Sequence, residues 1–256
     1  MSGHSHWSGI KHKKGLTDAK KAKFFTKIGR LISVVAKKGG PDPNANPALR
    51  LAIEKAREVN MPKANIDRAI EKATGKSGST EILDEVAYEA FGSGGIALII
   101  KGITDNKNRA AADVRKIVVK NGGRMAEIGS VSWMFEVKSK IQVLPEKEEA
   151  KFGPKEIKPK ISEEELELTA IEAGADDIKK TENESGNTEF TIYCSSESAQ
   201  NLRNSLKQKG VETSQPELEL IPKQTIEIDE NTREKIEKLL DELEDCEDVS
   251  EIFANF

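Results

Sequence analysis

The sequence predicts an α+β protein: a basic N-terminal three-helix domain followed by two α+β domains, one of them ferredoxin-like. Apolar residues of the first 75 positions recur with helical spacing, whereas the later segments alternate between strand-like runs and helices. The charge is also divided. Residues 1–79 hold 17 Lys and Arg against 6 Asp and Glu, and the remaining residues hold 23 against 38. A basic head on an acidic body indicates a polyanionic partner for the head.

The head is expected to start with a flexible arm over residues 1–16 and then form three helices. The first begins at residue 17 or 18 and ends near residue 38, before two glycines and a proline. The second begins at Asn46-Pro47, and the third follows Met61-Pro62 and closes at Gly75. Their expected inner faces are Phe24, Ile28, Leu31, Ile32 and Val35, then Leu49, Ile53, Ala56 and Val59, and finally Ile66, Ala69, Ile70 and Ala73.

The middle of the chain is expected to form an α+β domain that is completed by the C-terminal tail. Strands are predicted at 85–91, 95–104 and 130–137, with a helix over 108–123. The tail adds a strand at 225–228, a helix around 232–244 and a strand at 249–256. The predicted domain boundaries are therefore 1–78, then 79–138 together with 223–256, and finally 139–222.

Residues 139–222 are expected to be the ferredoxin-like domain. Strands at 141–144, 176–181, 189–194 and 211–220 alternate with two helices in the order β-α-β-β-α-β. Ser162 and Glu165 form a capping box at the start of the first helix, and Leu202 and Leu206 face inward from the second. Pro216 places the last strand at an edge or bulge of the sheet.

Basic side chains gather in the arm and on the first helix. Residues 1–40 hold 10 Lys and Arg against a single acid, Asp18, whereas a solvated helix face usually mixes both signs. We therefore expect this segment to bind nucleic-acid phosphates with strong salt dependence. The expected binding residues are Trp7, Lys11, His12, Lys13, Lys14, Lys20, Lys21, Lys23, Lys27, Arg30, Lys37 and Lys38.

Trp7 lies in an arm without local apolar partners. It either packs back onto the bundle or stacks on an unpaired base, as single-stranded RNA presents. His6 and His12 can stack beside it or contact phosphate. A Ser-Gly-His terminus, formed when Met1 is removed, can chelate copper(II) or nickel(II), which we regard as incidental. No metal site and no cofactor are expected.

Several short patterns fail as catalytic or ligand sites. GSGG at 92–95 lies between two strands and predicts a turn. GKS at 75–77 lacks the earlier glycine of a Walker A loop, because that position is Ile70. DNKN at 105–108 has Lys116 where an EF-hand loop requires Glu. Cys194 has no histidine partner outside the arm, so we expect no enzyme activity and no small-molecule substrate.

The segment GSVSWMF at 129–135 brings Trp133, Met134 and Phe135 together. A core strand is the expected interpretation, and a surface that docks a partner is the alternative. No apolar run approaches the roughly 20 residues needed to span a bilayer, and the N-terminus lacks a signal-peptide core. With only two cysteines, we expect a cytoplasmic protein without membrane contact. The sequence shows no coiled-coil heptads, which favours a monomer.

Six segments together resemble the YebC family and span the chain from end to end. They are GHSHWSGIKHKK, DAKKAKFFTKIGRLI, DPNANPALRLAIEKAREVNMPKANIDRAIEKATG, TDNKNRAAADVR, GSVSWMF and LEDCEDV. The resemblance implies a basic helical domain and two α+β domains. Bacterial members of the family are described as DNA-binding transcriptional regulators and are also implicated in relieving ribosomes stalled on proline-rich chains. Mitochondrial members are translational activators.

The sequence departs from the family pattern at two basic positions. His6 stands where Lys is usual and Ala48 where Arg is common, so contacts at these positions are not carried over. We favour a ribosome-associated translation factor that grips rRNA with residues 1–38, because a Lys-rich helix suits phosphates better than base edges. A DNA-binding transcriptional regulator is the alternative, and a dimer interface that matches two half-sites would favour it.

Overall fold

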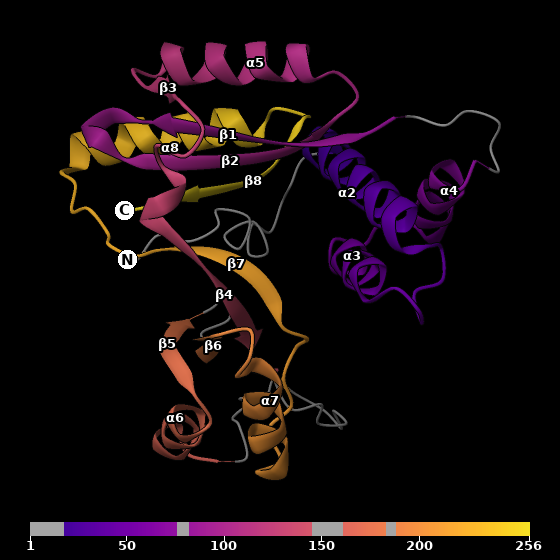
Figure 1. Cartoon of the computed structure of the whole chain (residues 1–256), viewed down its shortest axis with the longest axis vertical. Helices are drawn as coiled ribbons and strands as arrows, with labels where there is room; N and C mark the ends of the chain where they lie inside the picture. The colour runs from indigo at the N-terminus through magenta and orange to yellow at the C-terminus, as the bar shows by residue number, and fades with distance from the viewer. Residues whose placement is uncertain (1–17, 76–81, 145–160, 183–187) are drawn as a thin grey trace. The chain divides into compact units, whose positions relative to one another are not determined.

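The computed structural model describes residues 18–75, 82–144, 161–182 and 188–256 of the 256-residue chain. These residues form two compact units (Figure 1). One unit contains the chain up to Phe135 together with Pro222–Phe256, and the other is Glu136–Ile221. The predicted α+β class is confirmed, since in the described part of the chain helices α2 to α4 precede two four-stranded sheets. The predicted division into three domains stays a prediction, because the helices and the first sheet share one unit.

The first unit begins with a three-helix bundle of α2 (Asp18–Gly39), α3 (Pro47–Glu58) and α4 (Lys63–Ala73). The three predicted helices are confirmed. Most of the predicted inner positions are buried, namely Ile28, Ile32, Leu49, Ile53, Ala56, Ile66 and Ala69. Leu31, Val35, Val59, Ile70 and Ala73 pack partly buried against this core. Phe25 does so too, whereas the predicted core residue Phe24 is half-buried outside this cluster.

The turn between α2 and α3 is held by the buried side chain of Asn46. Its Oδ1 accepts a hydrogen bond from the backbone N–H of Leu49 at 3.1 Å, which caps α3. Its Nδ2 donates to the backbone oxygens of Val35 and Gly40, each at 2.9 Å. A Cβ at Gly39 would lie 2.6 Å from Asn46 Nδ2, so this close approach explains the glycine at the end of α2.

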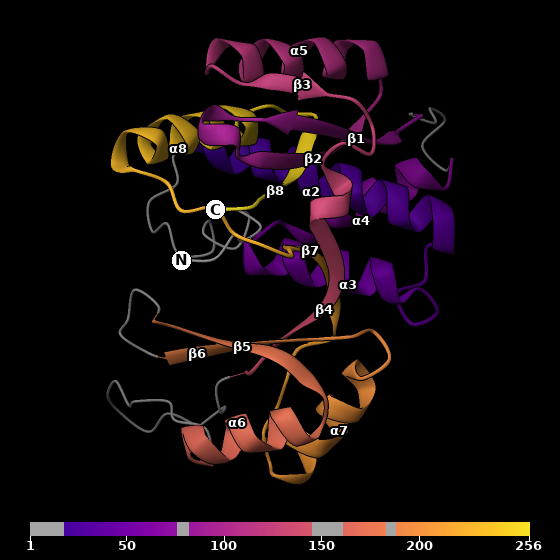
Figure 2. The same cartoon turned by 60° about the vertical axis from the view of Figure 1, so that its left-hand side comes forward.

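The same unit continues with an antiparallel sheet of β1 (Asp84–Phe91), β2 (Ala97–Thr104), β3 (Arg124–Ala126) and β8 (Val249–Ala254), in the order β3-β1-β2-β8. Strand β8 pairs with β2, so the C-terminal tail completes this sheet (Figure 2). Helices α5 (Lys107–Lys120) and α8 (Glu230–Glu244) pack on it through a shared core.

The strand predicted at 225–228 is wrong, because these residues precede α8 without forming a strand. One backbone hydrogen bond, from Ile226 N–H to the oxygen of Asn255 at 2.7 Å, joins the segment to the end of β8. The alternating apolar pattern has another cause: Ile228 packs against the core under the sheet.

The turn predicted at GSGG is confirmed. It joins β1 to β2 as an antiparallel pair whose register runs from Asp84 opposite Thr104 to Phe91 opposite Ala97. Gly94 has φ +72°, and a Cβ there would lie 2.8 Å from the side chain of Thr232 in α8. The glycine therefore allows a tight turn to pack against a helix.

The second unit is a ferredoxin-like sheet with two helices in the predicted β-α-β-β-α-β order. Its elements are β4 (Phe135–Gln142), α6 (Glu163–Glu172), β5 (Ala175–Glu182), β6 (Thr188–Cys194), α7 (Ala199–Gln208) and β7 (Glu217–Pro222), and its sheet order is β5-β6-β4-β7. Ser162 caps α6 through the N–H of Glu165 at 3.2 Å, as predicted. Leu202 and Leu206 are fully buried. Strand β7 starts just after Pro216 and lies at the edge.

The strand prediction around Trp133 is corrected. Residues Ser132–Met134 form a short 3₁₀ turn, and β4 begins only at Phe135. Trp133 is 64% exposed, and its indole N–H donates to the backbone oxygen of Ser130 at 2.9 Å, so the ring lies outside the core. The segments predicted as separate strands at 130–137 and 141–144 contribute to one strand. The partner-docking alternative for Trp133 stays a prediction.

Candidate nucleic-acid interface

The candidate residues divide between the arm and α2. Trp7, Lys11, His12, Lys13 and Lys14 lie outside the described residues, as do His6 and the Ser-Gly-His terminus. The others lie on α2 and are Lys20, Lys21, Lys23, Lys27, Arg30, Lys37 and Lys38. These basic side chains do not share one environment.

One edge of α2 places two lysines against the end of α8. Lys23 Nζ donates to the backbone oxygen of Asp245 at 3.3 Å and lies 3.5 Å from its carboxylate. Lys27 Nζ donates to the backbone oxygen of Glu244. The last carbonyls of a helix lack partners within the helix and carry partial negative charge. The two lysines satisfy this end of α8.

Lys27 is only 7% exposed. Burial lowers the pKa of its ammonium to about 8, although the neighbouring Cys246, Glu244 and Asp245 act in the opposite direction. Burial likewise raises the pKa of the Cys246 thiol. Lys27 is therefore mostly charged at neutral pH, with its charge directed at its own chain rather than at solvent.

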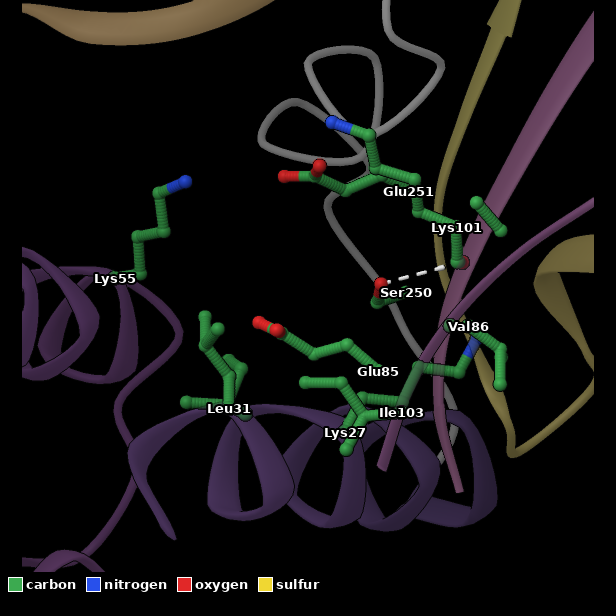
Figure 3. Close-up of a pocket in the computed structure, with 12 residues that line it drawn as sticks. Lys27, Leu31, Lys55, Glu85, Val86, Lys101, Ile103, Ser250 and Glu251 are labelled. Atoms are coloured by element: carbon green, nitrogen blue, oxygen red, sulfur yellow. Dashed lines mark hydrogen bonds between the residues drawn. The ribbon is translucent and has the colours of Figure 1, made fainter. Parts of the chain in front are cut away.

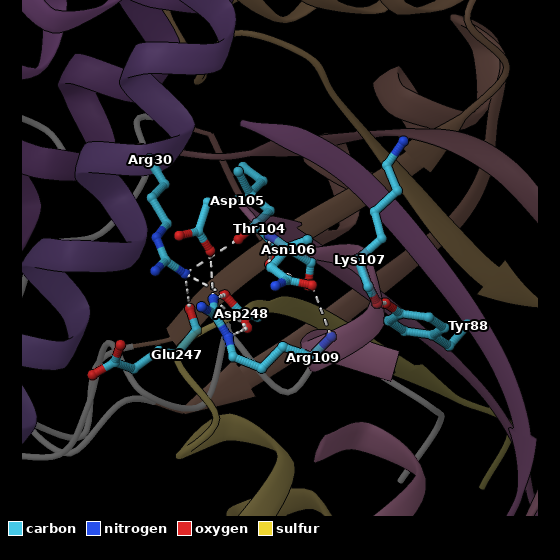
Figure 4. Close-up of polar contacts among 10 residues, drawn as sticks. Arg30, Tyr88, Thr104, Asp105, Asn106, Lys107, Arg109, Glu247 and Asp248 are labelled. Carbon is cyan, nitrogen blue, oxygen red and sulfur yellow. Dashed lines mark hydrogen bonds and ion pairs between the residues drawn. The ribbon is translucent and has the colours of Figure 1, made fainter. Parts of the chain in front are cut away.

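Arg30 meets the buried carboxylate of Asp248 (Figure 4). Its Nη1 donates to Asp248 Oδ1 at 2.7 Å and to the backbone oxygens of Glu247 at 3.0 Å and Ile103 at 3.3 Å. Arg109 of α5 brings its Nη2 to 3.2 Å from Asp248 Oδ2. The side chain of Asp248 is only 5% exposed, so its charge needs a partner within the protein. The guanidinium groups of Arg30 and Arg109 provide it. Lys23, Lys27 and Arg30 are called the docking edge below.

The other lysines of α2 point to the surface. Lys38 forms an exposed ion pair with Glu85. Lys20, Lys21 and Lys37 are exposed, and within the described ranges no acidic side chain forms an ion pair with them. These three residues are called the outer cations below. The structure thus separates cations that hold the chain together from cations that face solvent.

A groove of about 330 Å³ lies between α2 and α4. It is lined by Phe25, Thr26, Gly29, Arg30, Ser33, Met61, Asn65, Arg68, Ala69, Lys72 and Leu83. Arg30, Arg68 and Lys72 are its charged residues, and none of these described lining residues is acidic. Ser33 Oγ donates to the backbone oxygen of Ala69 at 2.8 Å and joins the two helices. Sequence reasoning missed Arg68 because α4 as a whole carries both signs of charge.

A second pocket, of about 430 Å³, lies beside the docking edge of α2 (Figure 3). Ile28, Leu31, Val86 and Ile103 supply its apolar lining. Its charged lining mixes both signs and comprises Lys27, Lys55, Lys101, Glu85 and Glu251. The carboxylates repel phosphate, so this pocket is poorly suited to a polyanion, in contrast to the groove.

Glu89 is a buried carboxylate that sequence reasoning also missed. It accepts hydrogen bonds from the backbone N–H groups of Gly129, Val131 and Ser132. Burial would raise its pKa, but these hydrogen bonds outweigh that effect and lower it. Glu89 therefore fixes the loop that presents Trp133.

The structure also bears on a reactive cysteine, a metal site and a membrane-spanning helix. Cys194 is fully buried in the ferredoxin-like core, and burial raises the pKa of its thiol, which disfavours the reactive thiolate. Among the residues that the structure describes, no group of three or more His, Cys, Asp or Glu side chains is arranged to hold a metal ion. None of the described helices has the length and apolar character required to cross a bilayer.

A helical bundle with outward cations, followed by two α+β sheets, matches the architecture implied by the sequence resemblance. The chain belongs to the TACO1/YebC family. Residues 5–76 match the family model described as the TACO1/YebC protein N-terminal domain, and residues 83–256 match the model of the TACO1/YebC second and third domain. The resemblance stated from the sequence is therefore confirmed.

Close relatives cover the chain along its whole length. Proteins from Kosmotoga olearia and Dictyoglomus turgidum are 44% and 43% identical over 256 residues, which is 100% of this chain and 94% and 96% of theirs. Both are named "Probable transcriptional regulatory protein". The crystal structure of a conserved hypothetical protein, Aq1575 from Aquifex aeolicus, matches with a TM-score of 0.75 at 39% identity, covering 98% of this chain and 96% of that one.

Proposed function

We propose that this protein is a non-enzymatic, nucleic-acid-binding regulator of gene expression, and that its helical bundle contacts the phosphate backbone. The observation that carries the proposal is the separation of charges on the bundle. The outer cations face solvent. The groove between α2 and α4 has only basic charged residues among its described lining. Such a surface attracts a polyanion by releasing its counterions. The names of the relatives support a regulatory role.

Of the two nucleic acids, we favour rRNA, and hence a ribosome-associated translation factor that relieves stalled elongation. Readers of the DNA major groove present Arg, Asn or Gln to base edges. On α2 the only arginine, Arg30, is bound to Asp248, and the outward cations are lysines. Lysines in this arrangement suit backbone phosphates, which position a protein without reading sequence.

A DNA-binding transcriptional regulator is the second candidate, and the names of the curated relatives favour it. This candidate predicts binding that depends on DNA sequence and a dimer whose symmetry matches two half-sites. The ribosome candidate predicts neither property.

Ribosome pelleting at several salt concentrations, with excess duplex DNA as competitor, separates the candidates. The test variant is Lys20→Glu/Lys21→Glu/Lys37→Glu, and the matched control is Lys116→Glu/Lys207→Glu/Lys223→Glu, which places the same charge change on exposed lysines outside the bundle. We expect salt-sensitive pelleting that survives the DNA and is lost only in the test variant. Displacement by one particular DNA sequence would support transcription instead. Equal behaviour of the two variants would refute a role for the bundle cations.

A further inference from the structure

Helix α2 contains two glycines, and the structure explains only one of them. Gly39 lies against Asn46, where a Cβ would approach to 2.6 Å. At Gly29, by contrast, no described atom lies within 4 Å of the position that a Cβ would take, and its φ is not positive. A glycine inside a helix is less stable than alanine at the same position. Among the residues that the structure describes, neither packing nor backbone conformation accounts for Gly29.

Gly29 lies on the wall of the groove between α2 and α4. Its neighbours on that wall, Thr26 and Ser33, are one helical turn away on either side and are small and polar, and Phe25 adds one aromatic ring to the wall. Facing it, Asn65 and Arg68 project from α4. Absence of a side chain at Gly29 leaves the helix surface open toward these polar and basic groups, which is the geometry that a close-approaching backbone requires.

The electrostatics of the groove select an anion. Arg30 belongs to the lining, but its charge is paired with Asp248, whereas Arg68 is exposed to solvent. A separate small pocket shares Ser33, Lys72 and Leu83 with the groove and is also lined by the exposed Lys37. None of the described residues that line the groove or this pocket is acidic.

We propose that this groove binds the sugar–phosphate backbone of one single-stranded RNA segment, with Arg68 contacting a phosphate and Gly29 providing the space for the backbone to approach. This inference deepens the proposed function and rests on it. Asn65 and Thr26 supply an amide and a hydroxyl that can hydrogen-bond a ribose 2′-hydroxyl, the group that distinguishes RNA from DNA. The groove holds only about 330 Å³, so we assign it one strand rather than a duplex.

The test uses the full chain and a fluorescein-labelled 12-nucleotide single-stranded RNA of mixed sequence, read by fluorescence anisotropy. Gly29→Leu fills the groove with a side chain while providing a better helix former, so the variant is expected to unfold at or above the wild-type temperature. Its RNA affinity is expected to fall about tenfold. Arg68→Gln removes the charge and is expected to cost a similar factor, about that of one charge-assisted hydrogen bond. Arg57→Gln, an exposed arginine on α3 outside the groove, is the matched control and is expected to change affinity less than about twofold.

The outcomes separate this inference from the proposed function. If the wild type binds RNA and both groove variants bind as well as Arg57→Gln, the groove assignment is wrong while nucleic-acid binding stands. If the wild type shows no salt-sensitive RNA binding, the proposed function fails as well. Equal binding of single-stranded DNA or duplex DNA of the same sequence, with equal loss in Gly29→Leu, would contradict the assignment to single-stranded RNA.

Discussion

The docking edge of helix α2 and the groove between α2 and α4 both present cations, but they differ in whether the protein itself supplies the partner. On the docking edge, Lys23, Lys27 and Arg30 face the carbonyls and the carboxylate of residues 244–248. On the groove side, Gly29 leaves open space in front of Arg68. Both sides attract negative charge, but on the docking edge the protein itself supplies that charge. A count of cations along a helix therefore overstates the number available to a partner.

The largest expected effect is at Asp248. Asp248→Ala leaves the largely buried guanidinium of Arg30 without its carboxylate. Arg109 is about half-exposed and keeps its ion pair with Asp105. Breaking a buried ion pair from one side destabilises by about 3 kcal/mol or more, because the remaining charge is uncompensated. Urea unfolding followed by circular dichroism is expected to show this loss in the free energy of unfolding. An unchanged midpoint would mean that the docking edge does not stabilise the protein.

The second effect is at Lys27. Its pKa is lowered to about 8 in the folded state from 10.5. Lys27→Met removes a desolvated charge at the loss of one hydrogen bond, so we expect about 2 kcal/mol of added stability at neutral pH. Between about pH 8 and 10.5 the unfolded wild type binds more protons than the folded one, so wild-type stability rises with pH. The advantage of Lys27→Met should shrink across that range, as measured by urea unfolding at several pH values. A difference independent of pH would show that burial does not perturb Lys27.

The third effect compares the two glycines. Gly29→Ala should stabilise the protein by about 1 kcal/mol, because alanine is the better helix former and no described atom opposes its Cβ. Gly39→Ala should destabilise it, because the Cβ meets Asn46 at 2.6 Å. Calorimetric midpoints are expected to move in opposite directions. If both variants shifted the midpoint in the same direction, packing would not distinguish Gly39 from Gly29.

The smallest effect is at Lys23. Its ion pair with Asp245 is half-exposed at 3.5 Å, and surface pairs of this kind contribute about 0.5 kcal/mol or less. Lys23→Ala should leave the free energy of unfolding within that limit, in contrast to Asp248→Ala at the other end of the docking edge. A loss as large as that of Asp248→Ala would show that exposure does not govern these contacts.

Much of the fold could be predicted from the sequence because local signals agreed with packing. Capping residues predicted the start of α3 at Asn46-Pro47 and the start of α6 at Ser162. Hydrophobic periodicity predicted the ferredoxin-like order of the second unit. The failures came where a short apolar pattern had another cause. At 225–228 the apolar residue Ile228 packs against a core without forming a strand. At 129–135 the ring of Trp133 lies outside the core and bonds to the backbone of Ser130. Such causes lie in tertiary contacts and are invisible to periodicity.

The candidate site was less predictable for a similar reason. Charge along α2 identified the basic head, but the partners of Lys27 and Arg30 lie more than 200 positions later in the sequence. The segment LEDCEDV contains these partners, and the sequence marked it only as a family feature. Arg68 was missed because a mixed-charge helix gives no signal. Only the packing of α4 against α2 places Arg68 opposite Gly29.

The most direct test of the central claim is the salt dependence of single-stranded RNA binding. Each phosphate contact contributes about 0.7 to the slope of log affinity against log salt concentration. Replacing the outer cations, in Lys20→Gln/Lys21→Gln/Lys37→Gln, should lower the magnitude of the slope by about 2. Replacing two cations of the docking edge, in Lys23→Gln/Lys27→Met, should leave the slope at the wild-type value. A slope lowered by the docking-edge variant and unchanged in the outer variant would contradict the account.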